Sequence, residues 1–140
     1  MRAGYPGATM AEQQQKNLVL ILVRELAAHV ASPVFVVDAW GTLVYYNERA
    51  EKILGLRFDE AGELSADEWG TRWSPEDLNG NPLKPEQLPL SVSLTERRPV
   101  HAPIRIAGSD GQRRVIEVSA IPLFAAGEKF VGAMALFWEP

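Results

Sequence analysis

The chain has 140 residues, 46% of them hydrophobic, which is enough to bury one proper core and favours a single domain. Fourteen basic residues against eighteen acidic ones give a net charge of −4, without the basic excess typical of proteins that bind nucleic acid. Cysteine is absent, which excludes disulfides, a thiolate nucleophile and cysteine-ligated metal or iron–sulfur sites, and we expect a reducing cytoplasmic setting.

Residues 1–10 contain Gly and Pro without a regular pattern, which predicts a flexible tail. Residues 11–30 contain neither and predict one amphipathic helix with a polar first half. The longest apolar run, 18–23, is far shorter than the roughly 20 residues that cross a bilayer. Because this run also lacks a charged leader and a cleavage site, we expect no membrane contact and no secretion signal.

The predicted helix 11–30 carries apolar side chains on more than one side. One stripe has helical spacing, and we expect it to pack on the domain: Val19, Leu22, Val23, Leu26 and Val30. A second line lies beside it: Leu18, Ile21 and Ala28. Either one wide face packs on a sheet, or the second line meets a partner subunit. For the second alternative we expect a symmetric homodimer with this interface: Leu18, Ile21, Leu22, Glu25 and Ala28.

The segment that follows encodes a hairpin. An unbroken β-branched and aromatic run, 34–37, is too short for a helix and predicts a strand with both faces covered. Asp38 can accept backbone N–H groups in the next turn, and Gly41 tolerates the positive φ that such a turn uses. Residues 43–46 then return as a second strand.

A capped helix continues from the hairpin. Asn47 is a preferred N-cap for a helix over 48–54, and Gly55 suits the position after its end. The segment 57–89 is the least regular part of the chain, which suits short helices or turns draped over a core. Its apolar anchors are Phe58, Leu64, Trp69 and Trp73.

The last predicted helix spans 85–97, with Pro85 in its first turn and Pro99 beyond its end. We expect its inner side to consist of Leu88, Val92 and either Leu94 or Thr95. Three strands then follow, over 100–107, 113–124 and 130–138.

The final predicted strand is apolar on both faces, which predicts a central position in an antiparallel sheet. One row consists of Val131, Ala133, Ala135 and Phe137, and the other of Gly132, Met134, Leu136 and Trp138. Helices should cover one face of this sheet, and the helix 11–30 the other.

Five motifs in this order resemble a PAS domain over 31–139: Pro33 to Gly55, Asn79 to Leu83, Asp110-Gly111, Val118 to Leu123 and Val131 to Phe137. The resemblance implies an α+β fold for residues 31–140. Its five-stranded antiparallel sheet has the order 2-1-5-4-3, with helices enclosing a pocket on one face and an N-terminal helix on the other. It also implies a sensory or signal-input domain of a bacterial-type regulator, which senses a small molecule or a partner and acts on a kinase, cyclase or transcription regulator.

The end of the chain departs from this family pattern. Members commonly end in Phe-x-Asp followed by Ile or Val and then Thr, whereas this chain reads Phe137-Trp-Glu-Pro140. Glu139 can serve as the acid. Whether the chain is a fragment of a larger regulator or a free-standing module is left open by the sequence.

A pocket between sheet and helices is the candidate ligand site, with Tyr hydroxyls or Trp N–H groups as its polar contacts. Its candidate lining is Phe35, Tyr45, Ile53, Trp69, Trp73, Leu88, Val92, Ile104, Ile106, Ile116 and Met134. We expect a small apolar or aromatic ligand. The alternative is that these side chains fill the core, which would leave a ligand-free interaction and dimerisation module.

Bound haem is disfavoured because the helix 85–97 has no His to serve as axial ligand. A cysteinyl-flavin adduct is disfavoured because the chain has no Cys. His29, near a helix end, and His101, at a strand start, are more typical of a dipole partner and a surface residue than of ligands, so we expect no metal.

An enzyme is the weaker hypothesis. Asp38, Tyr45 and Tyr46 together suggest an acid and phenol pair of the kind used by small isomerases. Strand alternation sends the two tyrosines to opposite faces, however, and Asp38 already has a turn to stabilise. We therefore expect no catalytic residues.

Overall fold

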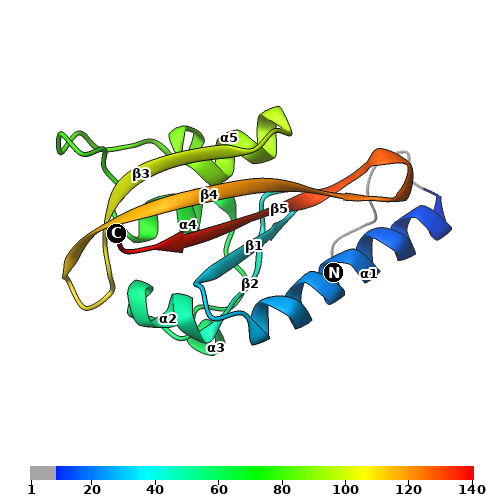
Figure 1. Ribbon diagram of the computed structural model, residues 1–140, viewed down its shortest axis with the longest axis horizontal. Helices are drawn as coiled ribbons and strands as arrows, with labels where there is room; N and C mark the ends of the chain where they lie inside the picture. Colours follow the sequence, from blue (N-terminus) through cyan, green and yellow to red (C-terminus); the bar gives the residue numbers. More distant parts are fainter. Residues whose placement is uncertain (1–8) are drawn as a thin grey trace.

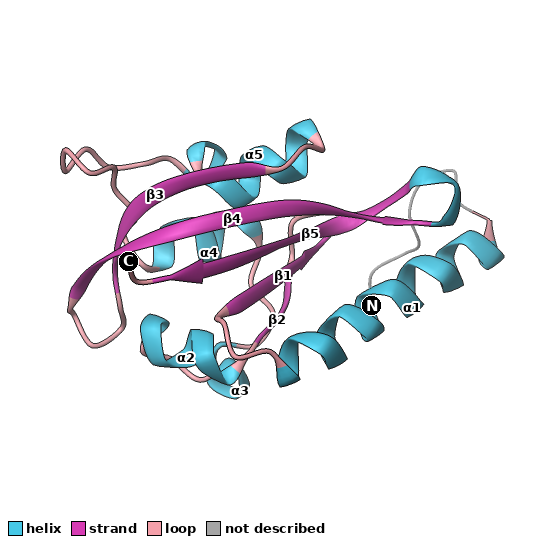
Figure 2. Cartoon of the chain, viewed as in Figure 1, coloured by secondary structure: helices cyan, strands magenta, loops and turns pink. Residues whose placement is uncertain are grey.

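A computed structural model describes residues 9–140, so most of the predicted flexible tail lies outside the described residues. Five strands form one antiparallel sheet in the order β2-β1-β5-β4-β3, as the sequence predicts (Figures 1 and 2). The strands are β1 (Val34–Asp38), β2 (Leu43–Tyr46), β3 (Val100–Ala107), β4 (Arg113–Ala125) and β5 (Lys129–Trp138). The α-helices are α1 (Met10–His29), α2 (Glu48–Leu54), α3 (Phe58–Ala61), α4 (Ala66–Arg72) and α5 (Pro89–Glu96). The α+β fold class is confirmed.

The hairpin β1–β2 forms as predicted. The Asp38 carboxylate oxygen Oδ1 accepts the backbone N–H groups of Trp40 at 2.9 Å and Thr42 at 3.0 Å. Gly41 has a φ of +83°, which favours glycine in this turn. Phe35 then lies opposite Tyr46 across the two strands.

Strand β5 is central, and its two rows of side chains face different layers. Ala133, Ala135 and Phe137 of the first row are buried on the side of α2 to α5, and Val131 of the same row is also buried. Met134 and Leu136 face the opposite side and pack in the cluster beneath α1. A Cβ at Gly132 would collide with the carbonyl oxygen of Val37 on the paired strand β1, so this close approach of the two strands requires glycine.

Helix α1 covers the second face of the sheet, but with a different side from the one predicted. Leu20, Val23 and Ala27 pack toward β1, and Lys16 is also buried. Of the predicted stripe, Leu22, Leu26 and Val30 are exposed, so for these three the expectation was wrong. The small Ala27 side chain lets the helix end pack closely against Val34 and Val36, and this contact fixes which side of the helix faces the sheet.

The predicted helix 85–97 is also corrected at its start. Pro85–Gln87 forms a single 3-10 turn, and Leu88 is extended, with φ −69° and ψ 144°. Pro89 causes this break, since a residue that precedes proline is disfavoured in the α region. Helix α5 therefore starts at Pro89; Leu88 is buried, Val92 and Leu94 are half-buried, and Thr95 is exposed.

Candidate functional site

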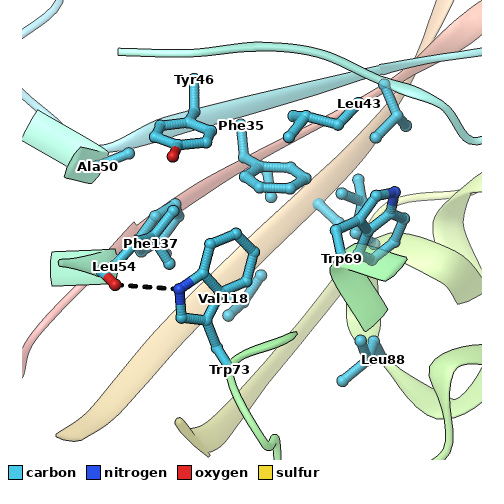
Figure 3. Packing of buried hydrophobic residues seen from close by; sticks show 14 of the residues in the cluster. Phe35, Leu43, Tyr46, Ala50, Leu54, Trp69, Trp73, Leu88, Val118 and Phe137 are labelled. Atoms are coloured by element: carbon cyan, nitrogen blue, oxygen red, sulfur yellow. Dashed lines mark hydrogen bonds between the residues drawn. The ribbon is translucent and has the colours of Figure 1, made fainter. Parts of the chain in front are cut away.

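Aromatic side chains form the centre of the core between the sheet and α2 to α5 (Figure 3). The Phe35 ring stacks on Tyr46 with centroids 5.8 Å apart and an interplanar angle of 1°. Trp69 and Trp73 meet the Phe35 ring edge-on at 5.6 and 6.3 Å. These contacts join β1 and β2 to the irregular segment that the sequence predicts as a core cover.

A cavity of about 90 Å³ lies beside this aromatic cluster, and all of its lining residues are buried. Its walls come from the sheet, from the end of α2, from α4 with the segment after it, and from the start of α5. The lining consists of Phe35, Leu54, Trp69, Trp73, Pro75, Leu88, Pro89, Leu90, Ile104, Ile106, Ile116, Val118, Ala135 and Phe137.

The polar atoms expected to serve a ligand are already hydrogen-bonded within the chain. Trp69 Nε1 donates to the Gly41 carbonyl oxygen at 2.8 Å, and Trp73 Nε1 donates to that of Leu54 at 3.0 Å. The Tyr46 hydroxyl, outside the cavity wall, donates to the Leu56 carbonyl oxygen at 2.7 Å. A ligand in the cavity would therefore find apolar side chains and the faces of aromatic rings to contact.

The structure brings together most of the predicted pocket residues: Phe35, Trp69, Trp73, Leu88, Ile104, Ile106 and Ile116. Tyr45 and Met134 lie on the α1 side of the sheet, because strand alternation turns them away from the cavity. Ile53 packs at the edge of the core and Val92 is half-buried on α5, and both lie outside the cavity wall.

Sequence reasoning missed several lining residues: Leu54, Pro75, Pro89, Leu90, Val118, Ala135 and Phe137. The alternation along β5 predicts that Ala135 and Phe137 share a face and that Met134 points to the opposite one, which is where the structure places it. Pro75 and Pro89 carry no such signal, since Pro75 lies in the loop that pairs with β3 through Glu76 and Arg105, and Pro89 is at the start of α5.

Asp38, Tyr45 and Tyr46, the residues of the disfavoured acid and phenol pair, each have other partners in the structure. The Asp38 carboxylate is bonded to its own turn, and the Tyr46 hydroxyl to the backbone at Leu56. Burial, followed by the nearby Glu51 charge, raises the pKa of Tyr46 to about 12. Tyr45 faces α1, where the Arg24 guanidinium lies 5.0 Å from its ring centroid. Burial raises the pKa of Tyr45, and Arg24 partly opposes that effect.

The two histidines lie in ordinary surface contacts. His29 Nδ1 is 2.9 Å from the Glu25 carbonyl oxygen of the preceding turn, and His101 Nε2 is 2.9 Å from Glu117 Oε2. Within residues 9–140 no three His, Asp or Glu side chains gather where they could hold a metal ion. The same residues contain no helix with the length and apolar character to cross a bilayer.

The candidate interface residues on α1 all lie on its outer side, away from the sheet. Leu18, Ile21 and Leu22 are 54, 57 and 53% exposed. Glu25 and Ala28 are exposed beside them. Leu26, at 69%, extends the same apolar surface.

Comparison with known proteins relates the chain to one protein family. A family model described as the PAS fold matches residues 27–140. No curated protein matches the chain.

Several solved structures share the fold. The PAS domain of the fruit-fly ELK potassium channel superposes with a TM-score of 0.67 at 10% identity, covering 86% of this chain and 95% of that one. A PAS domain from Colwellia psychrerythraea gives 0.61 at 16% identity, with 87 and 97% covered. The PAS domain of nitrogen regulation protein NR(II) from Vibrio parahaemolyticus gives 0.57 at 14% identity, with 85 and 98% covered. At these identities the likeness concerns the fold alone.

Proposed function

The chain belongs to the PAS family, and from this premise we propose that it is a signal-input domain that takes up a small apolar molecule in its core cavity. We further propose that two copies pair through α1 and that the occupied domain acts on a separate output. The regulatory protein NR(II) and the ELK channel, whose PAS domains share this fold, support a role beside an effector. A binding role, rather than catalysis, is the function that this site supports best.

The observation that carries the proposal is the apolar wall of the cavity. A buried water molecule needs two to four polar partners, and this wall has its Trp N–H groups already engaged, so we expect the cavity to be dry. Dry apolar cavities of about 150 Å³ bind benzene or xenon. A cavity of about 90 Å³ suits xenon, or benzene after small movements of the wall. A haem would need an axial ligand, which none of the lining residues can supply.

Benzene binding to the purified chain tests the cavity directly. We expect saturating benzene to raise the melting temperature by a few degrees, because it binds only the folded state. The substitution Ala135→Leu fills the cavity from the sheet side and should remove this increase. Ala126→Leu, the same change at an exposed site, is the matched control and should keep it.

Two results would overturn the ligand part of the proposal. One is a benzene response that Ala135→Leu leaves intact, which would place the binding elsewhere. The other is the absence of any response to benzene or xenon together with no co-purifying compound in the native mass spectrum. The second result would favour the alternative of a ligand-free interaction module.

Pairing through α1 rests on its exposed apolar side, since exposed apolar patches of this kind mark association surfaces. A second copy is the partner we choose, because a twofold axis along the helix would bring Leu18, Ile21 and Leu22 of one chain against the same residues of the other. Light scattering should then give a mass near twice 15.5 kDa. A monomer mass at tens of micromolar would contradict the pairing.

A further inference from the structure

One side chain, Asn47, holds the start of the short helix α2, and all of its hydrogen-bonding groups have partners. Asn47, 1% exposed, accepts the backbone N–H groups of Val34 and Ala50 through Oδ1, each at 3.0 Å. Its Nδ2 donates to the carbonyl oxygens of Ala27 and Ser32, each at 2.9 Å. All the donors and acceptors of the amide are thus used. One side chain joins the last turn of α1, the start of β1 and the first turn of α2.

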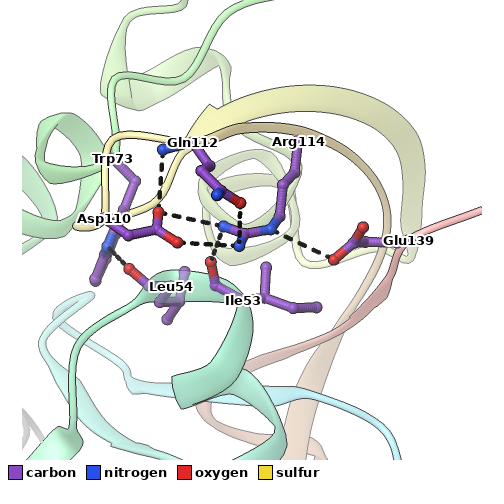
Figure 4. Close-up of polar contacts among 7 residues, drawn as sticks. All are labelled: Ile53, Leu54, Trp73, Asp110, Gln112, Arg114 and Glu139. Atoms are coloured by element: carbon purple, nitrogen blue, oxygen red, sulfur yellow. Dashed lines mark hydrogen bonds and ion pairs between the residues drawn. The ribbon is translucent and has the colours of Figure 1, made fainter.

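The other end of α2 is held through its last carbonyl groups (Figure 4). The Leu54 oxygen accepts Trp73 Nε1 at 3.0 Å and the Ser109 backbone N–H at 2.8 Å. The neighbouring Ile53 oxygen accepts Nη1 of Arg114 at 3.1 Å. The cavity wall and an arginine of β4 therefore meet at adjacent carbonyl groups of one helix turn.

Arg114 continues this contact to the end of the last strand. Its Nη2 lies 3.1 Å from Asp110 Oδ2, and its Nε lies 3.6 Å from Glu139 Oε1. A Cβ at Gly108 would come within 2.8 Å of Arg114 Nη1 and 3.0 Å of the Ile53 oxygen, so the close approach depends on glycine there. Arg114 is only 18% exposed, which limits the screening of its contacts by water.

We propose that α2 couples the core cavity to both ends of the domain, through Asn47 to α1 and through Arg114 to Glu139. This inference rests on the proposed function, because the signal it transmits is occupation of the cavity. A molecule beside the Trp73 ring would displace that ring and, through Nε1, the Leu54 carbonyl group. The helix has seven residues and is about 10 Å long, so it moves as one body, and both of its ends respond together.

The coupling can be measured without a ligand, by hydrogen exchange of the two buried indole N–H groups in the whole chain. The substitution Arg114→Gln removes the contacts to Ile53 and Glu139. We expect it to speed exchange at Trp73 Nε1 about tenfold, as the loss of one supporting hydrogen bond would. Trp69 Nε1 also lies in the cavity wall but bonds to Gly41, outside α2, and should change less than about twofold.

The reverse direction uses a matched pair of variants, Trp73→Phe and Trp69→Phe. Each keeps an aromatic ring and loses one indole donor. Only Trp73→Phe should shift the NMR signals of the Asn47 side-chain amide and of Arg114 Nε. Trp69→Phe should leave both signals in place, because its donor supports the turn after β1.

Clear results would overturn the proposal. Equal acceleration at both indoles would indicate general loosening, and no acceleration at Trp73 would mean that Arg114 does not support it. If Arg114→Gln does not fold, Glu139→Gln, at an exposed side chain, should give a smaller change confined to Trp73, and its absence would be decisive. A failure of benzene to bind would overturn the ligand part of the proposed function and would not alter the outcome of the indole exchange test, whereas benzene binding without any shift at Asn47 would overturn the coupling alone.

Discussion

The two faces of the sheet are packed to different degrees. On the side of α2 to α5, aromatic and aliphatic side chains from β1 to β5 form one large buried cluster with hydrogen-bonded Trp and Tyr groups. Beneath α1, the fully buried apolar side chains within residues 9–140 are Ala27, Val34 and Val36, with half-buried neighbours around them. The first face thus buries its apolar side chains within a single chain, whereas the second face leaves more of its apolar side chains partly exposed.

The difference indicates where the folding stability of the single chain is located and where the proposed pairing would occur. The stability of the single chain comes mainly from the cavity face, where burial removes the most apolar surface from water. Helix α1 uses its inner side on the sheet and leaves Ile21, Leu22 and Leu26 in solvent. Changes on the two faces should therefore separate into those that unfold the chain and those that alter pairing.

The largest expected effect is the substitution Phe35→Ala. Phe35 is 6% exposed and is the ring on which Tyr46, Trp69 and Trp73 converge. Truncation of such a residue costs about 3–5 kcal/mol of unfolding free energy. Urea denaturation measures the loss. Leu26→Ala on α1, at a 69% exposed site, is the control and should change the unfolding free energy of the monomer by less than about 0.5 kcal/mol. Similar losses for both variants would contradict the separation of the two faces.

The next largest effect is the pH dependence of folding stability that Tyr46, on the cavity side of the sheet, should cause. The pKa of Tyr46 is raised from 10.0 to about 12, chiefly by burial and then by Glu51. Below pH 10 the phenol is protonated in both states, so its contribution is fully present. Between pH 10 and 12 the unfolded chain ionises first, and stability should fall by roughly 2–3 kcal/mol.

The comparison of Tyr46→Phe with the wild-type chain isolates this effect. Urea unfolding from pH 8 to 12 should show a smaller decline for the variant, after a loss of about 1 kcal/mol at pH 8 for the hydrogen bond to Leu56. Tyr45→Phe is the control on the α1 side, where Arg24 counteracts the pKa shift, and it should retain most of the wild-type decline. Parallel curves for wild type and Tyr46→Phe would contradict the assignment.

Local patterns predicted the elements with strong signals. The run 34–37, the Asp38 turn and the Asn47 cap each combine backbone preference with a side chain that bonds nearby, and the structure confirms them. The apolar side chains on both faces of β5 also predicted its central position, which the strand order confirms. These elements depend on neighbours in sequence, so the sequence alone determines them.

The features that the sequence did not predict depend on contacts between residues that are far apart in the chain. The orientation of α1 depends on how Ala27 fits β1, and the break before α5 on Pro89, which the helical pattern concealed. The cavity wall includes Pro75 because the loop after α4 pairs with β3 through Glu76 and Arg105, and it includes Leu90 because α5 packs into the core. Arg114 gave no sequence signal, since its partners Ile53 and Glu139 lie far from it in the chain.

A smaller effect on the unfolding free energy should come from α5, one of the helices that cover the cavity face of the sheet. Ser93 on α5 is 0% exposed, and its hydroxyl has no hydrogen-bond partner within residues 9–140. Ser93→Ala removes this uncompensated polar group and should raise the unfolding free energy by up to about 1 kcal/mol. Ser91→Ala, on the same helix and 9% exposed, is the matched control and should gain less. A loss of stability for Ser93→Ala would show that the hydroxyl is compensated.

The smallest effect on the single chain, and the sharpest test of the α1 face, is Ile21→Glu. At 57% exposure the monomer loses little by this change, so its unfolding free energy should move by less than about 0.5 kcal/mol. In a symmetric pair the same change places two carboxylates near one axis in an apolar contact, and the mass from light scattering should fall from dimer to monomer. Gln14→Glu, an exposed site in the polar half of α1, adds the same charge and should leave the mass unchanged. If Ile21→Glu remains dimeric, the pairing uses another surface, and the apolar outer side of α1 awaits a different partner.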